Sequence, residues 1–218
     1  IRDVAPSRGL GDVYKRQDVN HIKNVIRLKV GDEISISNGI DGRDYRCGIA
    51  QITEDEVRCE LRFIKEDGVE LPVKVCLFQG LPKGDKMELI VQKSVELGAY
   101  QVIPVATKRA VVKLDAKKAK KKVERWQQIA VSAAKQAGRG IIPEVGEVCT
   151  YAQALKQAEE LDVVLIPYEL AKGMEETKQI IAGIRPGQSV GIFIGPEGGF
   201  EEEEVAPVSY THLRAHET

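Results

Sequence analysis

The sequence predicts an α/β fold in two parts, a small barrel-like β unit and a larger domain with a mostly parallel sheet. Before residue 70, short alternating strands are joined by turn dipeptides, a pattern typical of antiparallel β structure. After Pro72, apolar strands alternate with amphipathic helices, which is typical of a parallel sheet covered on both faces. The composition is that of a globular protein, since the 218 residues are 43% hydrophobic and 30% charged, with a net charge of −1.

The β-rich unit is expected over residues 18–70. A short helical piece beginning at His21 leads to a turn and then to a strand over about 33–37. The stretch "NGIDGRDYRCGIAQI" predicts a hairpin, because Asn-Gly and Asp-Gly are strong turn dipeptides. The stretch "EVRCELRFI" alternates like a further strand, and the polar stretch "KEDGVELP" predicts a linker.

The α/β domain is expected over residues 72–206. Strands are predicted at 73–78, 101–106, 163–167 and 189–194, and helices at 84–98, 115–138, 151–160 and 175–182. Asp85 and Glu88 have the spacing of a capping box, and Gly98 and Gly138 follow the last periodic residues of two helices. Trp126 falls on the apolar stripe of the long helix, so we expect it in the core.

Residues 1–17 and 207–218 have no periodicity that fits their neighbours, and we expect them to be foreign or disordered ends. No apolar run reaches the length that spans a bilayer, and the N-terminus lacks the apolar region of a signal peptide. The cysteines have neither zinc nor redox spacing. We therefore expect reduced thiols of a cytoplasmic protein at Cys47, Cys59, Cys76 and Cys149.

The segment "FIGPEGGFEEEEV", from Phe193 to Val205, is the strongest candidate site. It places a glycine-rich turn at the carboxyl end of a strand, where ligands of parallel sheets bind. A phosphate is disfavoured, because Glu197 lies in the turn and the glutamates of 201–204 follow it. A ligand with hydroxyls and positive charge suits these carboxylates, and S-adenosylmethionine fits that description. The alternative is a connection whose glycines merely turn the chain.

A basic stretch accompanies this loop. From Lys108 to Arg125 there are nine cationic and two anionic residues. Lysines on a helix are typical of a solvated face, but beside a cofactor loop they also suit RNA phosphates. Arg109 and Arg139 each follow an element that points to the carboxyl edge of the sheet, where an arginine fork suits a phosphate or a uridine carbonyl. The alternative for each arginine is a structural ion pair.

Five segments in register resemble the ribosomal RNA small subunit methyltransferase E family: "HIKNVIRLKVGDEI", "LPKGDKMELIVQKSVELG", "KRAVVK", "ERWQQIAVSAAKQAGR" and "IGPEGGF". The resemblance covers about residues 20–206. It implies a PUA-like β-barrel followed by a SPOUT methyltransferase domain with a trefoil knot. It also implies a homodimer that methylates N3 of a uridine in 16S rRNA, within the small ribosomal subunit, using S-adenosylmethionine. Such a methyl transfer needs no catalytic metal.

The loop chemistry and the resemblance together assign candidate residues. Cofactor binding is expected at Ile194, Gly195, Pro196, Glu197, Gly198 and Gly199, and at Ile166 and Pro167 where "PYE" (167–169) ends another strand. A catalytic role is expected for Arg109, Arg139 and Glu197, of which Glu197 either orients the ligand or acts as a base. RNA contacts are expected at His21, Lys23, Arg27, Lys108 and Lys113. The first three form one helical face that either touches RNA or stabilises the fold.

The sequence departs from the family after "GPEGGF". The family continues to a final strand and a loop resembling "LGPRILR", which are missing here. We therefore expect a C-terminally truncated chain with an incomplete knot and half of the cofactor pocket, so an inactive fragment is one alternative. An RNA-binding accessory protein without chemistry is another. A nucleotide-binding enzyme of a different class would need a phosphate loop such as GxGxxG, which does not occur.

Overall fold

The structure is a computed structural model that describes residues 12–13, 19–65, 70–110, 115–167, 174–205 and 214–216. The chain divides into two compact units. The first comprises residues 1–70 together with 134–142, and the second comprises residues 71–133 together with 143–218. The sequence predicts a change of structure close to residue 70, but it gives no sign that 134–142 belongs with the first unit.

The first unit is a four-stranded antiparallel sheet with a short helix against it. Its strands are β1 (Asp12–Val13), β2 (Glu33–Ile36), β3 (Asp44–Ile52) and β4 (Val57–Lys65), in the order β1-β4-β3-β2. The helix η1 (His21–Ile26) is of the π type and buries Ile22 among alternate strand residues such as Ile36 and Ile49. The predicted β-rich unit is confirmed, including the hairpin between β2 and β3.

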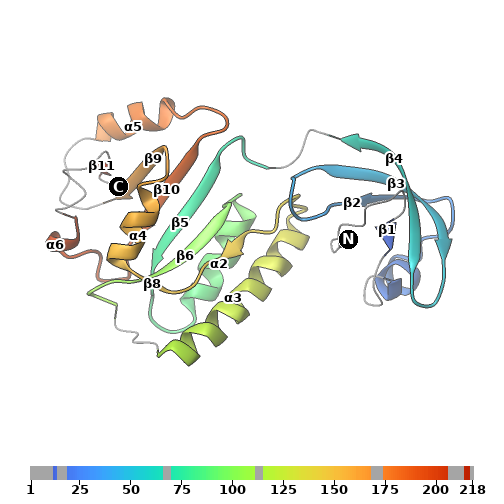
Figure 1. Cartoon of the computed structure of the whole chain (residues 1–218), viewed down its shortest axis with the longest axis horizontal. Helices are drawn as coiled ribbons and strands as arrows, with labels where there is room; N and C mark the ends of the chain where they lie inside the picture. Colours follow the sequence, from blue (N-terminus) through green and yellow to red (C-terminus); the bar gives the residue numbers. More distant parts are fainter. Residues whose placement is uncertain are drawn as a thin grey trace. The chain divides into compact units, whose positions relative to one another are not determined.

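The second unit is an α/β domain built on a parallel sheet (Figure 1). Its strands are β5 (Lys74–Gly80), β6 (Gln101–Ala106), β7 (Glu144–Val145), β8 (Cys149–Thr150), β9 (Val163–Pro167), β10 (Ser189–Ile194) and β11 (Arg214–His216). Its helices are α2 (Lys86–Glu96), α3 (Ala116–Gln136), α4 (Tyr151–Ala158), α5 (Met174–Ala182) and α6 (Glu202–Val205). The end of α3, from Ala134 onward, clusters with the first unit.

The strand order in this sheet is β11-β9-β10-β5-β6-β7, and β8 also pairs with β6. Every pairing described in this sheet is parallel, so the predicted mostly parallel sheet is confirmed. Parallel strands joined by helices bring their carboxyl ends to one edge. The loops after β5, β6 and β10 therefore emerge at the same edge of the sheet.

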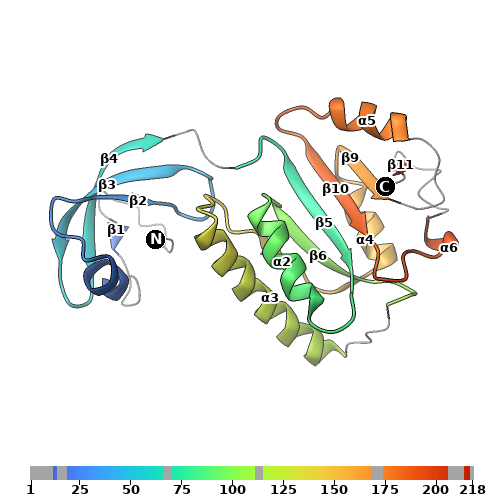
Figure 2. The same ribbon diagram turned by 180° about the vertical axis from the view of Figure 1, so that it is seen from behind.

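Helices cover both faces of the parallel sheet. The two opposite views show α2 and α3 on one face and α4 on the other (Figure 1, Figure 2). In the core shared with α4, the rings of Phe78 in β5 and Phe193 in β10 stack with their centroids 4.3 Å apart. Trp126 of α3 is 3% exposed, which confirms the prediction that it lies in the core. The strands that carry the candidate loop thus rest on close aromatic packing.

One of the predicted helix signals is wrong. Asp85 is the N-cap of α2 but makes no side-chain capping hydrogen bond, so the predicted capping box is absent. Glu88 instead accepts two hydrogen bonds from the Arg125 guanidinium of α3, because a charged fork binds a carboxylate more strongly than a backbone N–H does. The predicted helix ends are confirmed, since Gly98 and Gly138 adopt φ values of 102° and 67°.

Short strands occur in both of the ends that the sequence predicts to lie outside the fold. β1 pairs with β4, with Asp12 opposite Cys59, and β11 pairs with β9, with Arg214 opposite Leu165. Residues 206–213, on which the predicted incomplete knot depends, lie outside the described residues. The foreign origin of the two ends stays a prediction.

Candidate functional site

The candidate site lies at the carboxyl ends of two neighbouring parallel strands, β5 and β10. The register pairs Ile194 with Gln79, so the loop after β10 begins beside Gly80. A Cβ atom on Gly80 would lie 2.6 Å from Cδ of Pro196 and 2.7 Å from its nitrogen. A glycine allows this close approach, which fixes where the loop leaves the sheet.

A buried amide ties the two strand ends together. Gln79 is 4% exposed. Its Nε2 donates to the carbonyl oxygen of Gly80 at 2.9 Å and to that of Gly195 at 3.4 Å. A buried amide that lost such partners would cost free energy, so these bonds hold the start of the loop in place.

The loop from Gly195 to Phe200 folds tightly on itself. A Cβ atom on Gly195 would lie 3.0 Å from backbone atoms of Gly199. The amide of Gly199, which has a left-handed φ of 67°, donates to the Pro196 carbonyl oxygen at 2.8 Å. The buried ring of Phe200 lies 5.6 Å from the ring of Tyr151 and anchors the far end of the loop on the core.

Glu197 is held by the segment around the start of α2. Its carboxylate accepts the Lys83 backbone N–H at 3.2 Å and Nζ of Lys86 at 2.7 Å. The hydrogen bond from Lys86, followed by those from backbone N–H groups, lowers the pKa of Glu197 from 4.5 to about 2. A carboxylate with this pKa is ionised at neutral pH and is a weak base. Of the two roles predicted for Glu197, the geometry favours orientation of a ligand.

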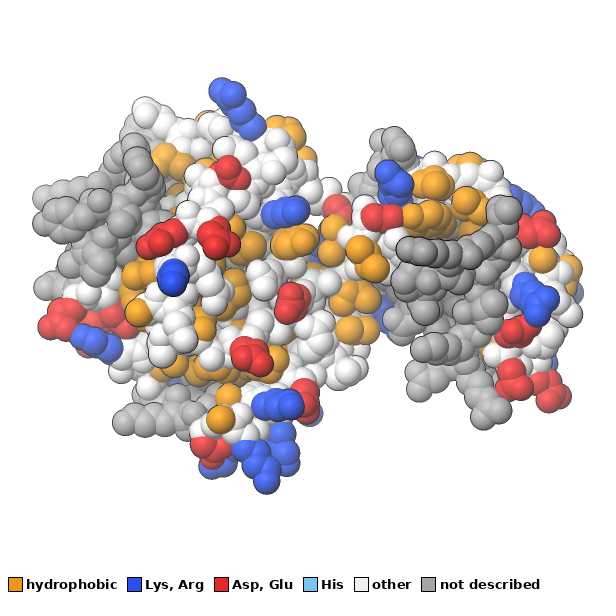
Figure 3. Space-filling view, in the orientation of Figure 1, with side chains coloured by type: hydrophobic (Ala, Val, Ile, Leu, Met, Phe, Trp, Pro, Cys, Tyr) orange, Lys and Arg blue, Asp and Glu red, His pale blue; other side chains and the backbone are white. Residues whose placement is uncertain are grey.

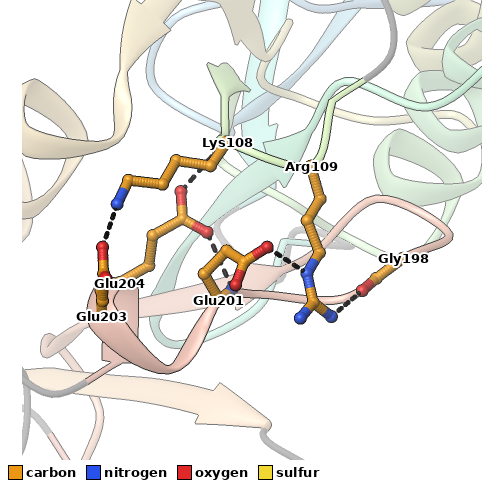
Figure 4. A network of polar contacts seen from close by, with 6 residues as sticks. All are labelled: Lys108, Arg109, Gly198, Glu201, Glu203 and Glu204. Carbon is orange, nitrogen blue, oxygen red and sulfur yellow. Dashed lines mark hydrogen bonds and ion pairs between the residues drawn. The ribbon is translucent and has the colours of Figure 1, made fainter.

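Arg109 reaches the same loop from the turn that follows β6 (Figure 4). Its Nη1 donates to the Gly198 carbonyl oxygen at 2.6 Å, and its Nε donates to the Glu201 carboxylate at 2.8 Å. The hydrogen bond to Arg109 lowers the pKa of Glu201. The Arg109 side chain remains 41% exposed, so a cation lies beside the glycine-rich loop and within reach of an anionic ligand.

Two further glutamates of the acidic block hold Lys108, the residue before Arg109 (Figure 4). The exposed Glu203 pairs with the Lys108 ammonium and raises the pKa of the lysine. The buried Glu204 accepts the Lys108 backbone N–H at 2.9 Å and the Glu201 backbone N–H at 3.0 Å. Glu204 has no predicted role from the sequence, although its spacing from Glu201 at a helix start is a capping signal.

The remaining predicted cofactor residues lie at the ends of β9 and β10. Ile166 is fully buried in the core, Pro167 is partly buried at the end of β9, and Ile194 is 38% exposed. The residues 168–169 of the "PYE" segment lie outside the described residues. The described site is therefore built by the loop after β10, the end of β5 and the turn after β6.

Arg139 lies in the first unit, in a buried ion pair. It is 3% exposed, and its Nε and Nη2 donate to one carboxylate oxygen of Glu70. The other oxygen of Glu70 accepts the backbone N–H groups of Gly140 at 2.7 Å and Ile141 at 2.9 Å. This is the structural ion pair that the sequence left as the alternative, and a contact between Arg139 and RNA stays a prediction.

The other predicted RNA contacts are exposed where they are described. His21, Lys23 and Arg27 lie on and directly after η1. His21 and Lys23 are two residues apart and do not share a helical face, so the prediction that all three do so is wrong. Lys113 lies outside the described residues.

The first half of α3 is basic and exposed. Its exposed lysines are Lys117, Lys118, Lys120 and Lys121. Blue side chains gather at the lower end of the second unit in Figure 3, where α3 begins in Figure 1. Within the described ranges, no group of three or more His, Cys, Asp or Glu side chains is placed to hold a metal ion. In the same ranges, no helix is both long and apolar enough to cross a bilayer.

Comparison with known protein families covers both units. An RNA methyltransferase domain matches residues 69–213, and an RNA methyltransferase PUA domain matches residues 14–62. The glycine-rich loop and Arg109 both lie within the first match. The chain therefore carries an RNA methyltransferase domain together with a PUA domain.

The chain belongs to the ribosomal RNA small subunit methyltransferase E family. It is 42% identical to the member from Bacillus subtilis (strain 168) over 192 residues, which cover 87% of this chain and 75% of that protein. It is 30% identical to the member from Mycobacterium tuberculosis (strain CDC 1551 / Oshkosh) over 210 residues, which cover 95% and 78%. The resemblance found in the sequence motifs is confirmed.

Solved structures agree with this assignment. A ribosomal RNA small subunit methyltransferase E from Neisseria gonorrhoeae, bound to S-adenosyl methionine, has a TM-score of 0.75 at 27% identity, with 98% of this chain and 85% of that chain covered. A putative methyltransferase from Legionella pneumophila, in complex with the same cofactor, has a TM-score of 0.74 at 28% identity, with coverage of 100% and 88%.

Proposed function

We propose that this chain transfers a methyl group from S-adenosylmethionine to N3 of a uridine in the 16S rRNA of the small ribosomal subunit. Membership of an RNA methyltransferase family supports the reaction class, and the relatives are named for small subunit ribosomal RNA. The observation that carries the proposal is the contact between the glycine-rich loop and the exposed Arg109 at the carboxyl edge of a parallel sheet.

The residues of the loop fit S-adenosylmethionine. A Cβ atom on Gly199 would meet no heavy atom within 4 Å, so backbone groups on this side of the loop have room for a ligand. The ionised carboxylate of Glu197 favours a cationic donor over a phosphate. The cofactor would be held by residues 194–199, with the partly buried Pro167 at the end of the adjacent strand. Ile166, which is fully buried, would support Pro167 from the core. When bound, S-adenosylmethionine supplies an activated methyl group on a sulfonium ion.

Arg109 is the residue proposed to bind the uridine. N3 of uridine is a weak acid, and positive charge beside O2 or O4 stabilises the anion that forms when the N3 proton passes to water. The bonds to Gly198 and Glu201 hold the guanidinium in one orientation before the substrate arrives. Such positioning supplies a large part of a methyl transfer's acceleration, because the reacting groups no longer have to find each other.

Glu197 and Arg139 have other roles in this proposal. The carboxylate of Glu197, with a pKa of about 2, is too weak a base to accept the N3 proton efficiently, so it is assigned to orientation of the loop and its ligand. Arg139 is left out of the substrate site because its guanidinium is buried against Glu70. Its role is to hold the segment 139–142 in the first unit.

The proposal includes a homodimer acting in the cytoplasm. The family resemblance supports the dimer, and the free thiols of Cys76 and Cys149 support a reducing compartment. Light scattering tests the dimer, since the expected mass is twice the 24.0 kDa of the chain. A mass of one chain would overturn this part of the proposal alone.

The test of the reaction is methyl transfer from labelled S-adenosylmethionine to small-subunit particles from cells that lack the family enzyme. Digestion of the rRNA to nucleosides, followed by mass spectrometry, should detect N3-methyluridine. Label on another nucleoside would still support an RNA methyltransferase, but it would overturn the assignment to N3 of uridine. RNA binding without any transfer would favour an accessory protein.

A further inference from the structure

Two neighbouring glutamates at the start of α6 differ sharply in their surroundings. The Glu203 side chain is 81% exposed and contacts the ammonium of Lys108. Glu204 is 5% exposed, and both of its carboxylate oxygens accept backbone N–H groups. A buried carboxylate is costly unless it is hydrogen-bonded, so the placement of Glu204 indicates a defined structural task.

The two bonds of Glu204 join distant parts of the chain. Oε2 accepts the N–H of Glu201, three residues earlier, as a helix cap does. Oε1 accepts the N–H of Lys108, which is 96 residues away and belongs to the turn that carries Arg109. A capping role alone would need only the first bond. The second bond fixes the turn after β6 against the loop after β10.

We propose that Glu204 is a positioning residue for methyl transfer, and that it sets the position of the Arg109 guanidinium by clamping the backbone of the 107–109 turn to the start of α6. The inference rests on the proposed function, because Arg109 is there the group that binds the uridine. Glu204 touches neither cofactor nor substrate, and it acts through the turn.

The partly exposed Arg109 side chain anchors the turn through its bonds to Gly198 and Glu201. The other contacts of the turn in the described part of the chain are few. Its internal bond runs from the Ala110 N–H to the Thr107 carbonyl oxygen. The Thr107 hydroxyl is buried and has no hydrogen-bond partner among the described residues, so its side chain does not hold the turn. The Lys108 side chain is exposed and pairs with Glu203, a contact that water can replace. The hydrogen bond from the Lys108 backbone N–H to Glu204 is thus the buried contact, or tether, that holds the turn.

The chemistry of the tether makes it sensitive to a single atom. A carboxylate accepts two N–H groups, one at each oxygen, and both donors face Glu204 from fixed backbone. A glutamine has the same shape but offers one accepting oxygen, and its NH2 group would face the second N–H donor. Because the site is buried, water cannot easily fill the lost acceptor position. Glu204→Gln should therefore release either the turn or the helix start.

The test compares Glu204→Gln with Glu203→Gln, a matched control that removes the same charge at the neighbouring exposed position. For Glu204→Gln we expect kcat/KM for small-subunit particles to fall by at least about tenfold. For Glu203→Gln we expect a change of less than about threefold, because an exposed ion pair contributes little. Thermal unfolding of each variant shows whether the fold survives.

A double-mutant cycle with Arg109→Ala separates positioning from general stability. If Glu204 acts through Arg109, Glu204→Gln should have little further effect on kcat/KM once Arg109 is gone. Additive losses in the cycle would overturn the proposal, because they would mean that Glu204 acts independently of Arg109. Equal losses from the two glutamine variants would overturn it as well.

Hydrogen exchange gives a readout that does not depend on activity. The amide of Lys108 or that of Glu201 should exchange at least about tenfold faster in Glu204→Gln than in Glu203→Gln. Unchanged protection of both amides would refute the tether. A wild-type chain that is folded but transfers no methyl group would overturn the proposed function, and the exchange rates would still decide whether Glu204 holds the turn.

Discussion

The ammonium of Lys86 lies 2.7 Å from a carboxylate oxygen of Glu197, and this ion pair joins the first turn of α2 to the glycine-rich loop. The two residues are 111 positions apart in the chain. Because the pair is partly exposed, it adds little to the free energy of unfolding. Its main consequence is electrostatic, since it lowers the pKa of Glu197 from 4.5 to about 2 beside the proposed cofactor site.

Replacing Lys86 with Gln should raise the pKa of Glu197 from about 2 toward its ordinary 4.5, because Lys86 is the largest cause of the lowered value. In the wild type, the stabilisation of the loop by this carboxylate is present above pH 4.5 and is lost as the pH falls toward about 2. Carbon NMR of the glutamate side chains measures the titration. Lys93→Gln is the control, since Lys93 pairs with Glu96 on the same helix, and an unchanged Glu197 pKa in Lys86→Gln would contradict the assignment.

Glu197→Gln should leave the shape of the pH profile of kcat/KM unchanged between about pH 6 and pH 9, because a group with a folded pKa of about 2 does not titrate there. The affinity for S-adenosylmethionine should fall, since the loop loses its negative charge and its ion pair with Lys86. Calorimetry measures the affinity and methyl transfer measures the profile. Loss of a basic limb from the profile would instead identify Glu197 as the base.

The sequence predicted those parts of the fold that depend on local pattern. Apolar runs identified the strands of the parallel sheet, the stripe on the long helix identified Trp126 as core, and two glycines marked helix ends. The glycine-rich loop was also correctly placed at a strand end, because its spacing is local.

The errors and omissions share a different cause, which is competition from partners far along the chain. Glu88 has the spacing of a capping box, but Arg125 of another helix takes its carboxylate. Arg139 resembles a free cation at a sheet edge, yet Glu70 pairs with it across 69 residues. Glu204 was read as one of an acidic block, and its bond to Lys108 spans 96 residues. Spacing alone does not reveal such pairs.

Gly80→Ala should displace the loop after β10, because the new Cβ atom would lie 2.6 Å from Pro196 and 2.7 Å from its backbone nitrogen. We expect the affinity for S-adenosylmethionine to fall by about tenfold or more, and the free energy of unfolding to fall by about 1–3 kcal/mol. Calorimetry and denaturant titration measure the two effects. Gly146→Ala is the control, since its Cβ would meet atoms no nearer than 3.6 Å. Equal behaviour of the two variants would show that the close contact does not set the loop.

Replacing Lys117 and Lys121 together with Gln should weaken RNA binding and flatten its salt dependence. Both side chains are exposed on the first half of α3, four residues apart on one face. If each contacts one phosphate, the slope of log K against log salt should decrease by about 1.4 to 1.8. Filter binding over a range of salt concentrations measures the slope. The same change at Lys93 on α2 serves as a control for lost charge, and an unchanged slope would place this lysine group outside the RNA contact.

Arg109→Ala and Arg139→Ala should fail in different ways. Arg109 is exposed and bound to the loop, so its removal should leave the free energy of unfolding within about 1 kcal/mol and lower kcat/KM by at least about tenfold. Arg139 is buried, and its removal leaves the carboxylate of Glu70 without its ion-pair partner. For Arg139→Ala we expect the free energy of unfolding to fall by about 3 kcal/mol. This value is at the lower end of the range for a broken buried ion pair, because Glu70 keeps two backbone donors.

Denaturant titration and methyl transfer below the unfolding transition distinguish the two outcomes. The control for Arg139 is Glu70→Gln, which removes the charge of the partner and should produce a comparable loss of stability if the ion pair is the cause. A stable Arg139→Ala variant with strongly reduced kcat/KM would contradict the structural role. It would also restore the prediction made from sequence, that this arginine contacts RNA, because a buried residue that affects transfer without affecting unfolding must become accessible during the reaction.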